Sequence, residues 1–212
     1  PENIKKLPAE FFENIDKMSF QEIACTVAEA FFGEDVEKEA LDKIVCDTLS
    51  FDCPVVPITK KGESDTNIYT LELFHGPTLA FKDVGARFMA RLLQYFLKKG
   101  SKVQGVQGSE VNVLVATSGD TGSAVANGFL GVEGIHVYVL YPKGKVSPIQ
   151  ECQFTTLGKN ITAIEVDGVF DDCQALVKSA FMDADLNNHM KLTSANSINV
   201  ARFLPQAFYY FN

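Results

Sequence analysis

One lysine of this chain lies where an amine could do chemistry, in the segment Leu71–Asp83, whose sequence is LELFHGPTLAFKD. The pattern predicts a helix over residues 80–99, with a polar, solvent-facing stripe that runs from Asp83 to Lys98. Lys82 lies outside this stripe, and its helical neighbours are small or apolar, namely Gly85, Ala86, Met89 and Leu93. We expect this lysine to be partly desolvated near the positive end of a helix dipole, and both effects lower the pKa of its amine. A neutral amine can form a Schiff base with a carbonyl compound, although a lysine whose alkyl chain covers an apolar surface fits the same pattern.

The second chemical feature is the segment Thr117–Ser123, with the sequence TSGDTGS, which directly follows the apolar run Val111–Ala116. Four of its seven residues carry hydroxyl groups and two are glycines. The backbone N–H groups and hydroxyls of such a turn can surround an anion at the start of a helix. The same composition suits a capping turn in which Asp120 is the N-cap and small residues pack against a sheet. Both interpretations stay open, but the sequence lacks the GxxxxGK[ST] and GxGxxG patterns of nucleotide-binding loops.

Two other polar groups lie next to predicted helices. Lys143 and Lys145 follow an apolar run and precede a helix that starts near residue 148, so they could hold a phosphate or simply lie in a solvated loop. Asn196 and Asn199 precede Arg202, and their amides could either cap a helix or contact a ligand. Each of these four side chains is therefore a candidate ligand contact with a structural alternative.

Histidine and cysteine spacing gives no sign of a metal centre. The three histidines, His75, His136 and His189, are far apart in the sequence, although His75 is close enough to line a site around Lys82. The five cysteines form no C-x-x-C pair, and we expect reduced thiols at Cys25, Cys46, Cys53, Cys152 and Cys173. Neither a G-x-S-x-G nor an H-E-x-x-H motif occurs. We therefore predict a site without metal.

Composition and charge exclude several classes of protein. The 212 residues are 46% hydrophobic and 22% charged, which indicates a globular chain. Residues 1–70 contain 15 acidic and 7 basic side chains and carry the whole net charge of −8, so nucleic-acid binding is not expected. No apolar run approaches the ~18 residues of a membrane span, and no secretion signal is seen. We expect a cytoplasmic protein whose partner is a small molecule.

The predicted elements alternate between strands and helices after a helical beginning. We expect an α/β fold: an open, mostly parallel twisted sheet with flanking helices, over 68–212, preceded by a helical N-terminal segment, 1–67. The predicted helical regions are 8–50, with a break at Gly33, 80–99, 121–130, 147–158, 170–185, and one from 197 that Pro205 kinks. The predicted strands are 68–74, 111–116, 136–141 and 161–166, and the predicted loops are 51–57, 60–67 and 101–110. Ligands of such sheets bind at the carboxyl ends of the strands.

Four segments, in this order, resemble the threonine synthase family, which belongs to the fold-type-II pyridoxal-phosphate (PLP) enzymes together with tryptophan synthase β and cysteine synthase. They are LELFHGPTLAFKD at 71–83, ATSGDTGSAVA at 116–126, LYPKGKVSPIQ at 140–150 and SANSINVAR at 194–202. The resemblance covers residues 68–212 and is weaker over 1–67. Members of the family continue well beyond this length, and the missing part holds their glycine-rich loop for the PLP phosphate. The resemblance thus implies an incomplete enzyme, and we expect the isolated chain to bind PLP weakly or not at all.

The resemblance also implies roles for individual residues. Lys82 forms the Schiff base with PLP and then moves protons at Cα and Cβ of the substrate, while Asp120 lies near the phenolic oxygen of the cofactor, where related enzymes often have Asn. The implied reaction converts O-phosphohomoserine and water to threonine and phosphate, with PLP as the electron sink. On this basis we assign substrate contacts to Thr117, Ser118, Gly119, Thr121, Lys143, Lys145, Asn196, Asn199 and Arg202.

Two other functions fit the same sequence. One is a different PLP-dependent phospholyase or eliminase that acts on a related phosphorylated amine. The other is a non-catalytic homologue of the fold, a binding or signalling protein in which Lys82 is idle. The sequence leaves the oligomeric state open.

Overall fold

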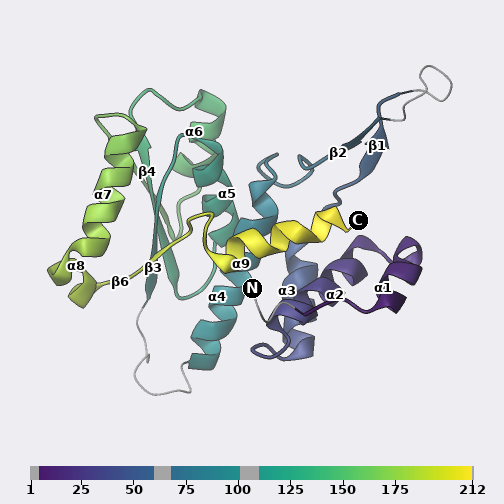
Figure 1. Cartoon of the computed structure of the whole chain (residues 1–212). Coiled ribbons are helices and arrows are strands. Elements are labelled where there is room, and N and C mark those ends of the chain that lie inside the picture. Colours follow the sequence, from purple (N-terminus) through teal and green to yellow (C-terminus); the bar gives the residue numbers. More distant parts are fainter. Residues whose placement is uncertain (1–4, 60–67, 101–109, 212) are drawn as a thin grey trace.

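A computed structural model of the chain describes residues 5–59, 68–100 and 110–211, and its centre is a four-stranded sheet (Figure 1). The strands are β3 (Val111–Ala116), β4 (Ile135–Pro142), β5 (Ile161–Val166) and β6 (Lys191–Ser194). Their order across the sheet is β5-β4-β3-β6, and each neighbouring pair is parallel. The predicted open parallel α/β sheet is therefore confirmed. The predicted loop over 60–67, and residues 101–109 of the predicted loop over 101–110, lie outside the described residues.

Helices cover both faces of this sheet, as Figure 1 shows. One side is covered by α4 (Lys82–Gly100), α5 (Asp120–Phe129) and α6 (Pro148–Thr155). The opposite side is covered by α7 (Phe170–Met182), which is followed by α8 (Ala184–His189). In the described part of the chain, no helix combines the length and apolar character that crossing a membrane requires.

The amino-terminal segment is helical, as predicted, and packs against α4. Its helices are α1 (Ala9–Asn14), α2 (Phe20–Phe32) and α3 (Lys38–Thr48), with a short 3-10 turn over Ile15–Lys17. Because α4 lies between two cores, its apolar positions divide between them. Val84, Phe88 and Leu92 pack with the amino-terminal helices, whereas Ala86, Met89 and Ala90 pack under the sheet. The boundary at residues 67 and 68 stays a prediction.

The predicted solvent-facing stripe of α4 is wrong at its start. The Asp83 carboxylate is fully buried, and the Arg87 guanidinium donates hydrogen bonds to the carbonyl oxygens of Asp47 and Thr48, 2.9 Å away. At this end of the stripe, Arg87 contacts the end of α3 and Asp83 contacts Thr78, whereas Lys98 at the other end is exposed. Periodicity shows that a helix has a polar face, but it does not show what covers that face.

The C-terminal third differs from the predictions at three places. The predicted helix over 170–185 ends at Met182, because the Asp183 carboxylate accepts a hydrogen bond from the Leu186 N–H and starts α8. The strand β6 was not expected. The last helix begins at Val200 rather than 197, as α9 (Val200–Phe203), and continues as a 3-10 helix over Leu204–Tyr210 that contains Pro205 near its start.

A small hairpin projects from the amino-terminal side. The strands β1 (Val55–Pro57) and β2 (Tyr69–Leu71) pair antiparallel. The predicted strand over 68–74 is thus shorter than expected, and the proline-rich connector over 51–57 supplies its partner. The proline at the end of β1 is consistent with a two-stranded ribbon, where few ladder hydrogen bonds are needed.

Thiol labelling checks the predicted free cysteines. Cys46 and Cys152 are exposed, whereas Cys53 and Cys173 are buried. Burial raises the pKa of Cys25 to about 12 and that of Cys53 to about 11, so these thiols rarely become the reactive thiolate. With a disulfide reagent at pH 8, we expect fast reaction of Cys46 and Cys152, and reaction of the other three at least about a hundredfold slower until the protein is unfolded. Mass mapping of the labelled peptides measures each rate; fast labelling of Cys53 in the native protein would contradict the packing described here.

Candidate active site

A cavity of about 500 Å³ opens at the carboxyl ends of β3 and β6, which is the edge where ligands of open α/β sheets are expected. It brings together residues from six parts of the chain. They are Lys82 of α4, Leu114, Val115 and Ala116 of β3, Thr121 of α5, Phe170, Gln174, Val177 and Lys178 of α7, Ser194, Ala195, Asn196 and Ser197 at and after the end of β6, and Arg202 of α9. Four residues predicted as site residues are thus neighbours of one cavity.

The position of Lys82 is fixed by the residue that follows it. The Asp83 carboxylate accepts hydrogen bonds from the Thr78 N–H, at 2.8 Å, and from the Thr78 hydroxyl, at 2.5 Å. Asp83 therefore ties the first turn of α4 to the loop before it, and Lys82 is held at the helix start. Buried carboxylates require such partners, because an unpaired buried charge is costly.

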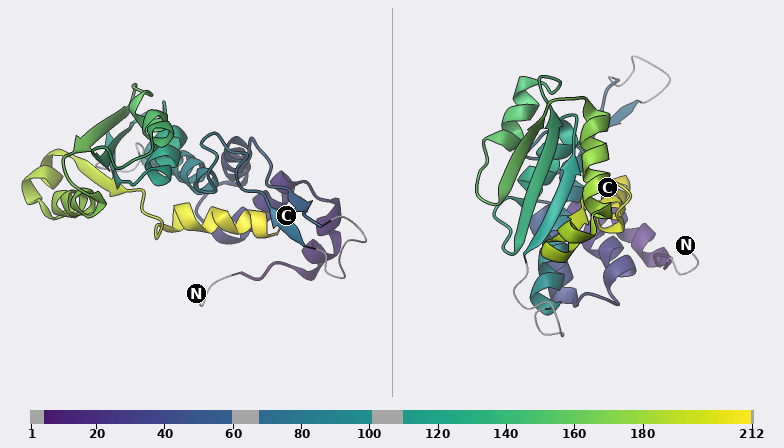
Figure 2. Two further views of the ribbon diagram at one scale, coloured as in Figure 1. Left: turned by 90° about the horizontal axis from the view of Figure 1, so that it is seen from above. Right: turned by 90° about the vertical axis from the view of Figure 1, so that its left-hand side faces the viewer.

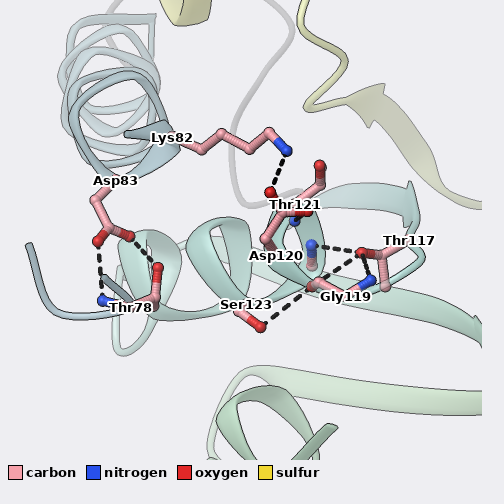
Figure 3. A network of polar contacts seen from close by, with 9 residues as sticks. Thr78, Lys82, Asp83, Thr117, Gly119, Asp120, Thr121 and Ser123 are labelled. Atoms are coloured by element: carbon pink, nitrogen blue, oxygen red, sulfur yellow. Dashed lines mark hydrogen bonds and ion pairs between the residues drawn. The ribbon is translucent and has the colours of Figure 1, made fainter. Parts of the chain in front are cut away.

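The Lys82 amine reaches the second predicted motif directly. Its Nζ lies 2.5 Å from Oδ2 of Asp120, and Figure 3 shows the side chain extending from α4 to the turn that starts α5. The Lys82 side chain is only 20% exposed, so the predicted desolvation is confirmed. The contact is made within the Thr117–Thr121 turn, the second of the two motifs that the sequence singled out.

The turn between β3 and α5 is held by its own first side chain. The Thr117 hydroxyl oxygen accepts hydrogen bonds from the N–H groups of Gly119, at 2.9 Å, and Gly122, at 2.7 Å (Figure 3). Gly119 has φ +145° and is the N-cap of α5, so the alternative with Asp120 as the cap is wrong. A β-carbon at Gly119 would come within 2.2 Å of the Gln150 side chain. Thr117 is fully buried and shapes the turn, whereas Ser118 is exposed beside it.

Removing the Thr117 hydroxyl tests this account of the turn. Thr117→Val keeps the shape of the side chain but leaves two buried N–H groups without their acceptor. We expect the free energy of unfolding to fall by about 2–3 kcal/mol, measured by urea denaturation. Ser118→Ala is the matched control, because its exposed hydroxyl has no described partner, and we expect a change below about 0.5 kcal/mol. Equal stability of the two variants would show that Thr117 does not hold the turn.

Arg202 is the most deeply buried charge at the cavity. It is 1% exposed, and its Nη1 donates a hydrogen bond to the Ala195 carbonyl oxygen at 2.5 Å. Its Nε is buried and has no hydrogen-bond partner among the described residues. Burial lowers the pKa of the guanidinium, and the negative charge of Asp120 opposes this effect. A buried donor without a partner, beside a cavity, suits a ligand with an acceptor atom.

Other predicted site residues lie outside this cavity. Lys143 is largely exposed and pairs with Glu165 at 3.6 Å, and Lys145 is exposed, which fits the solvated-loop alternative. The Asn199 side chain accepts a hydrogen bond from the Ala201 N–H and caps α9, so the capping alternative describes it. His75 contacts Glu72 at 2.7 Å and is not a lining residue. Among the described residues, no cluster of side chains could hold a metal.

The α7 residues that line the cavity were not predicted from the sequence. Phe170, Gln174, Val177 and Lys178 all line the cavity, and their i, i+4, i+7, i+8 spacing places them on one face of the helix. Gln174 and Lys178, the two polar residues on this face, were the available signal. Their place in the cavity wall depends on how α7 packs against β3 and β4, which local patterns do not show.

Comparisons with known proteins agree with this geometry. Residues 1–49 match the family model described as "Threonine synthase N terminus". The chain is 50% identical to the threonine synthase of Serratia marcescens over 185 residues, which is 87% of this chain and 40% of that protein. It is 44% identical to that of Escherichia coli K12 over 211 residues, which is 100% of this chain and 46% of that protein.

Solved structures give the same relation. A PLP-bound threonine synthase from Brucella melitensis superposes with a TM-score of 0.86 at 37% identity, and the match covers 100% of this chain and 44% of that one. The chain therefore spans less than half the length of the relatives it matches. Sequence motifs, fold and relatives agree along the described residues: the chain belongs to the threonine synthase family.

Proposed function

We propose that this protein acts in the PLP-dependent conversion of O-phosphohomoserine and water to threonine and phosphate. One observation carries the proposal: the Lys82 amine meets the Thr117–Thr121 turn at a cavity on the carboxyl edge of a parallel sheet. These two motifs are 38 positions apart in the sequence and come from different helices. The relatives that share the motifs are named threonine synthases.

The residues around the cavity suit a phosphorylated aromatic aldehyde such as PLP, which the Brucella relative is described as binding. The cavity has room for a ring, at about 500 Å³, with apolar walls at Leu114, Val115 and Val177. An amine with limited exposure lies at its edge. The unpartnered buried Nε of Arg202 supplies a donor for an anionic group. When bound, PLP would supply an electron sink for carbanions formed next to nitrogen.

The other roles in the proposed reaction fall to side chains and backbone groups of this chain. Lys82 would hold the cofactor and then accept and donate protons at Cα and Cβ of the substrate. Asp120 fixes where the amine points in the present arrangement, 2.5 Å from Nζ. Ser118, Gly119 and Thr121 surround the start of α5, where N–H groups and the helix dipole favour the substrate carboxylate.

The proposal extends to partners and location. The substrate class is a small phosphorylated amino acid, and the acidic charge balance argues against nucleic acid as a partner. Asn196 and Arg202, which line the cavity, would hold an anionic group of the substrate. We also propose a cytoplasmic location and a domain boundary between residues 67 and 68.

Product analysis tests the proposed reaction against its two alternatives. The chain, extended to the length of its relatives and supplied with PLP, is incubated with O-phosphohomoserine or with other phosphorylated amines, and both phosphate and threonine are measured. Coupled formation of phosphate and threonine from O-phosphohomoserine alone is the expected result. Phosphate release from the other amines without threonine would indicate a different phospholyase. No product from any of them, together with no PLP bound to Lys82, would favour a non-catalytic protein.

A further inference from the structure

The face of α7 that lines the cavity carries two polar side chains with no assigned role, Gln174 and Lys178. They are one turn apart on a 13-residue helix, at i and i+4, so their side chains are neighbours. Both line the cavity, and α7, the light-green helix, packs against β3 and β4 on one face of the sheet (Figure 2). Helices that merely cover a sheet normally present apolar residues at such positions.

The charged side chains that line the cavity are cationic. Its lining contains three cationic side chains, Lys82, Lys178 and Arg202, and no carboxylate among the described residues. The Lys82 charge is matched by Asp120, which lies behind it. Arg202 already donates to the Ala195 carbonyl. Lys178 has no ion pair or hydrogen bond within the described part of the chain, so its charge remains available to a ligand.

We propose that Lys178, assisted by Gln174, recognises the dianionic phosphate of the substrate from the α7 side of the cavity. This inference rests on the proposed function, and it assigns part of the substrate specificity to the α7 residues that line the cavity. An ammonium and a carboxamide can together donate several hydrogen bonds to phosphate oxygens. Arg202 is buried and Lys178 is exposed, and both line the cavity. A phosphate between them would lose less hydration than one enclosed completely.

The phosphate of the cofactor has the same chemistry as that of the substrate, so the two sources must be distinguished. If Lys178 served the cofactor, its loss would slow the attachment of PLP to Lys82 but not that of pyridoxal, which has no phosphate. If Lys178 serves the substrate, its loss leaves both attachments unchanged. Borohydride reduction followed by peptide mass mapping, on the chain extended to the length of its relatives, measures these attachments without any turnover.

The test uses inorganic phosphate as the probe and compares the dissociation constants of variants of the chain by 31P NMR titration. For Lys178→Gln we expect phosphate binding to weaken about three- to tenfold, as for a partly exposed charge-assisted contact. Gln174→Glu, which makes the same change in charge on the same helix face, is expected to weaken binding at least as much. Lys178→Arg should retain most of the affinity.

Lys191→Gln is the matched control, because Lys191 is exposed at the opposite end of β6 and lies outside the cavity lining. We expect its dissociation constant to stay within about twofold of the original. Equal weakening by Lys191→Gln and Lys178→Gln, no weakening by Lys178→Gln, or no phosphate binding by the unmodified chain would each overturn the inference. Slower attachment of PLP alone in Lys178→Gln would overturn the assignment to substrate. None of these outcomes removes the Lys82 adduct, on which the proposed function is tested separately.

Discussion

Lys82→Ala is expected to abolish the covalent attachment of PLP and to reduce threonine formation by at least about a thousandfold. The amine would be both the anchor of the cofactor and the group that moves protons, and each role alone is typically worth two or more orders of magnitude. The fold should survive the change, because Lys82 contacts only Asp120 and the adjacent Phe81 ring among the described side chains, and its neighbour Asp83 holds the helix start. Circular dichroism and urea denaturation check that the variant is folded.

The measurement is borohydride reduction of the protein with PLP, followed by mass mapping of the lysine peptides. Both proteins are prepared at the full length of the relatives, and we expect the adduct on Lys82 in the unmodified protein and on no specific lysine in the variant. Lys99→Ala is the matched control, since Lys99 also forms an ion pair, with Glu37 at 2.9 Å, but lies at the far end of α4. An adduct that persists at another lysine in Lys82→Ala would refute the assignment of the anchor.

The sequence predicts the strands of the central sheet well, because their apolar runs are continuous. The predicted strands 111–116 and 161–166 agree with β3 and β5 at both ends. The strand β6 escapes detection because its four residues, KLTS, include only one large apolar side chain. Its strand conformation depends on pairing with Val111–Leu114 of β3, which no local pattern reveals.

Within the site, local patterns find the residues that belong to motifs. Lys82 and the Thr117–Thr121 turn stand out by composition and by their positions next to predicted helices. The partner of Lys82 is not predictable in this way, because the contact with Asp120 joins α4 and α5. The place of Gln174 in the cavity wall is not predictable for a related reason, since it depends on which face of α7 packs against the sheet.

Gly85 is the position in α4 where the addition of one methyl group should lower the free energy of unfolding most. A β-carbon at Gly85 would lie 2.2 Å from the Arg202 carbonyl oxygen and 3.2 Å from its carbonyl carbon. Both are backbone atoms, so relief requires α4 and α9 to move apart, and this movement also displaces the buried Arg202 side chain at the cavity. Helix propensity favours alanine over glycine, so any loss must come from this contact.

We expect Gly85→Ala to lower the free energy of unfolding by about 3 kcal/mol, at the upper end of typical overpacking costs, and to weaken phosphate binding as well. Gly100→Ala is the matched control on the same helix, since a β-carbon there meets no atom within 4 Å. Its stability should be unchanged or rise by up to about 1 kcal/mol. Urea denaturation of the two variants gives the comparison. If both substitutions stabilise the protein alike, α4 and α9 are not in the close contact that places Arg202 beside Lys82.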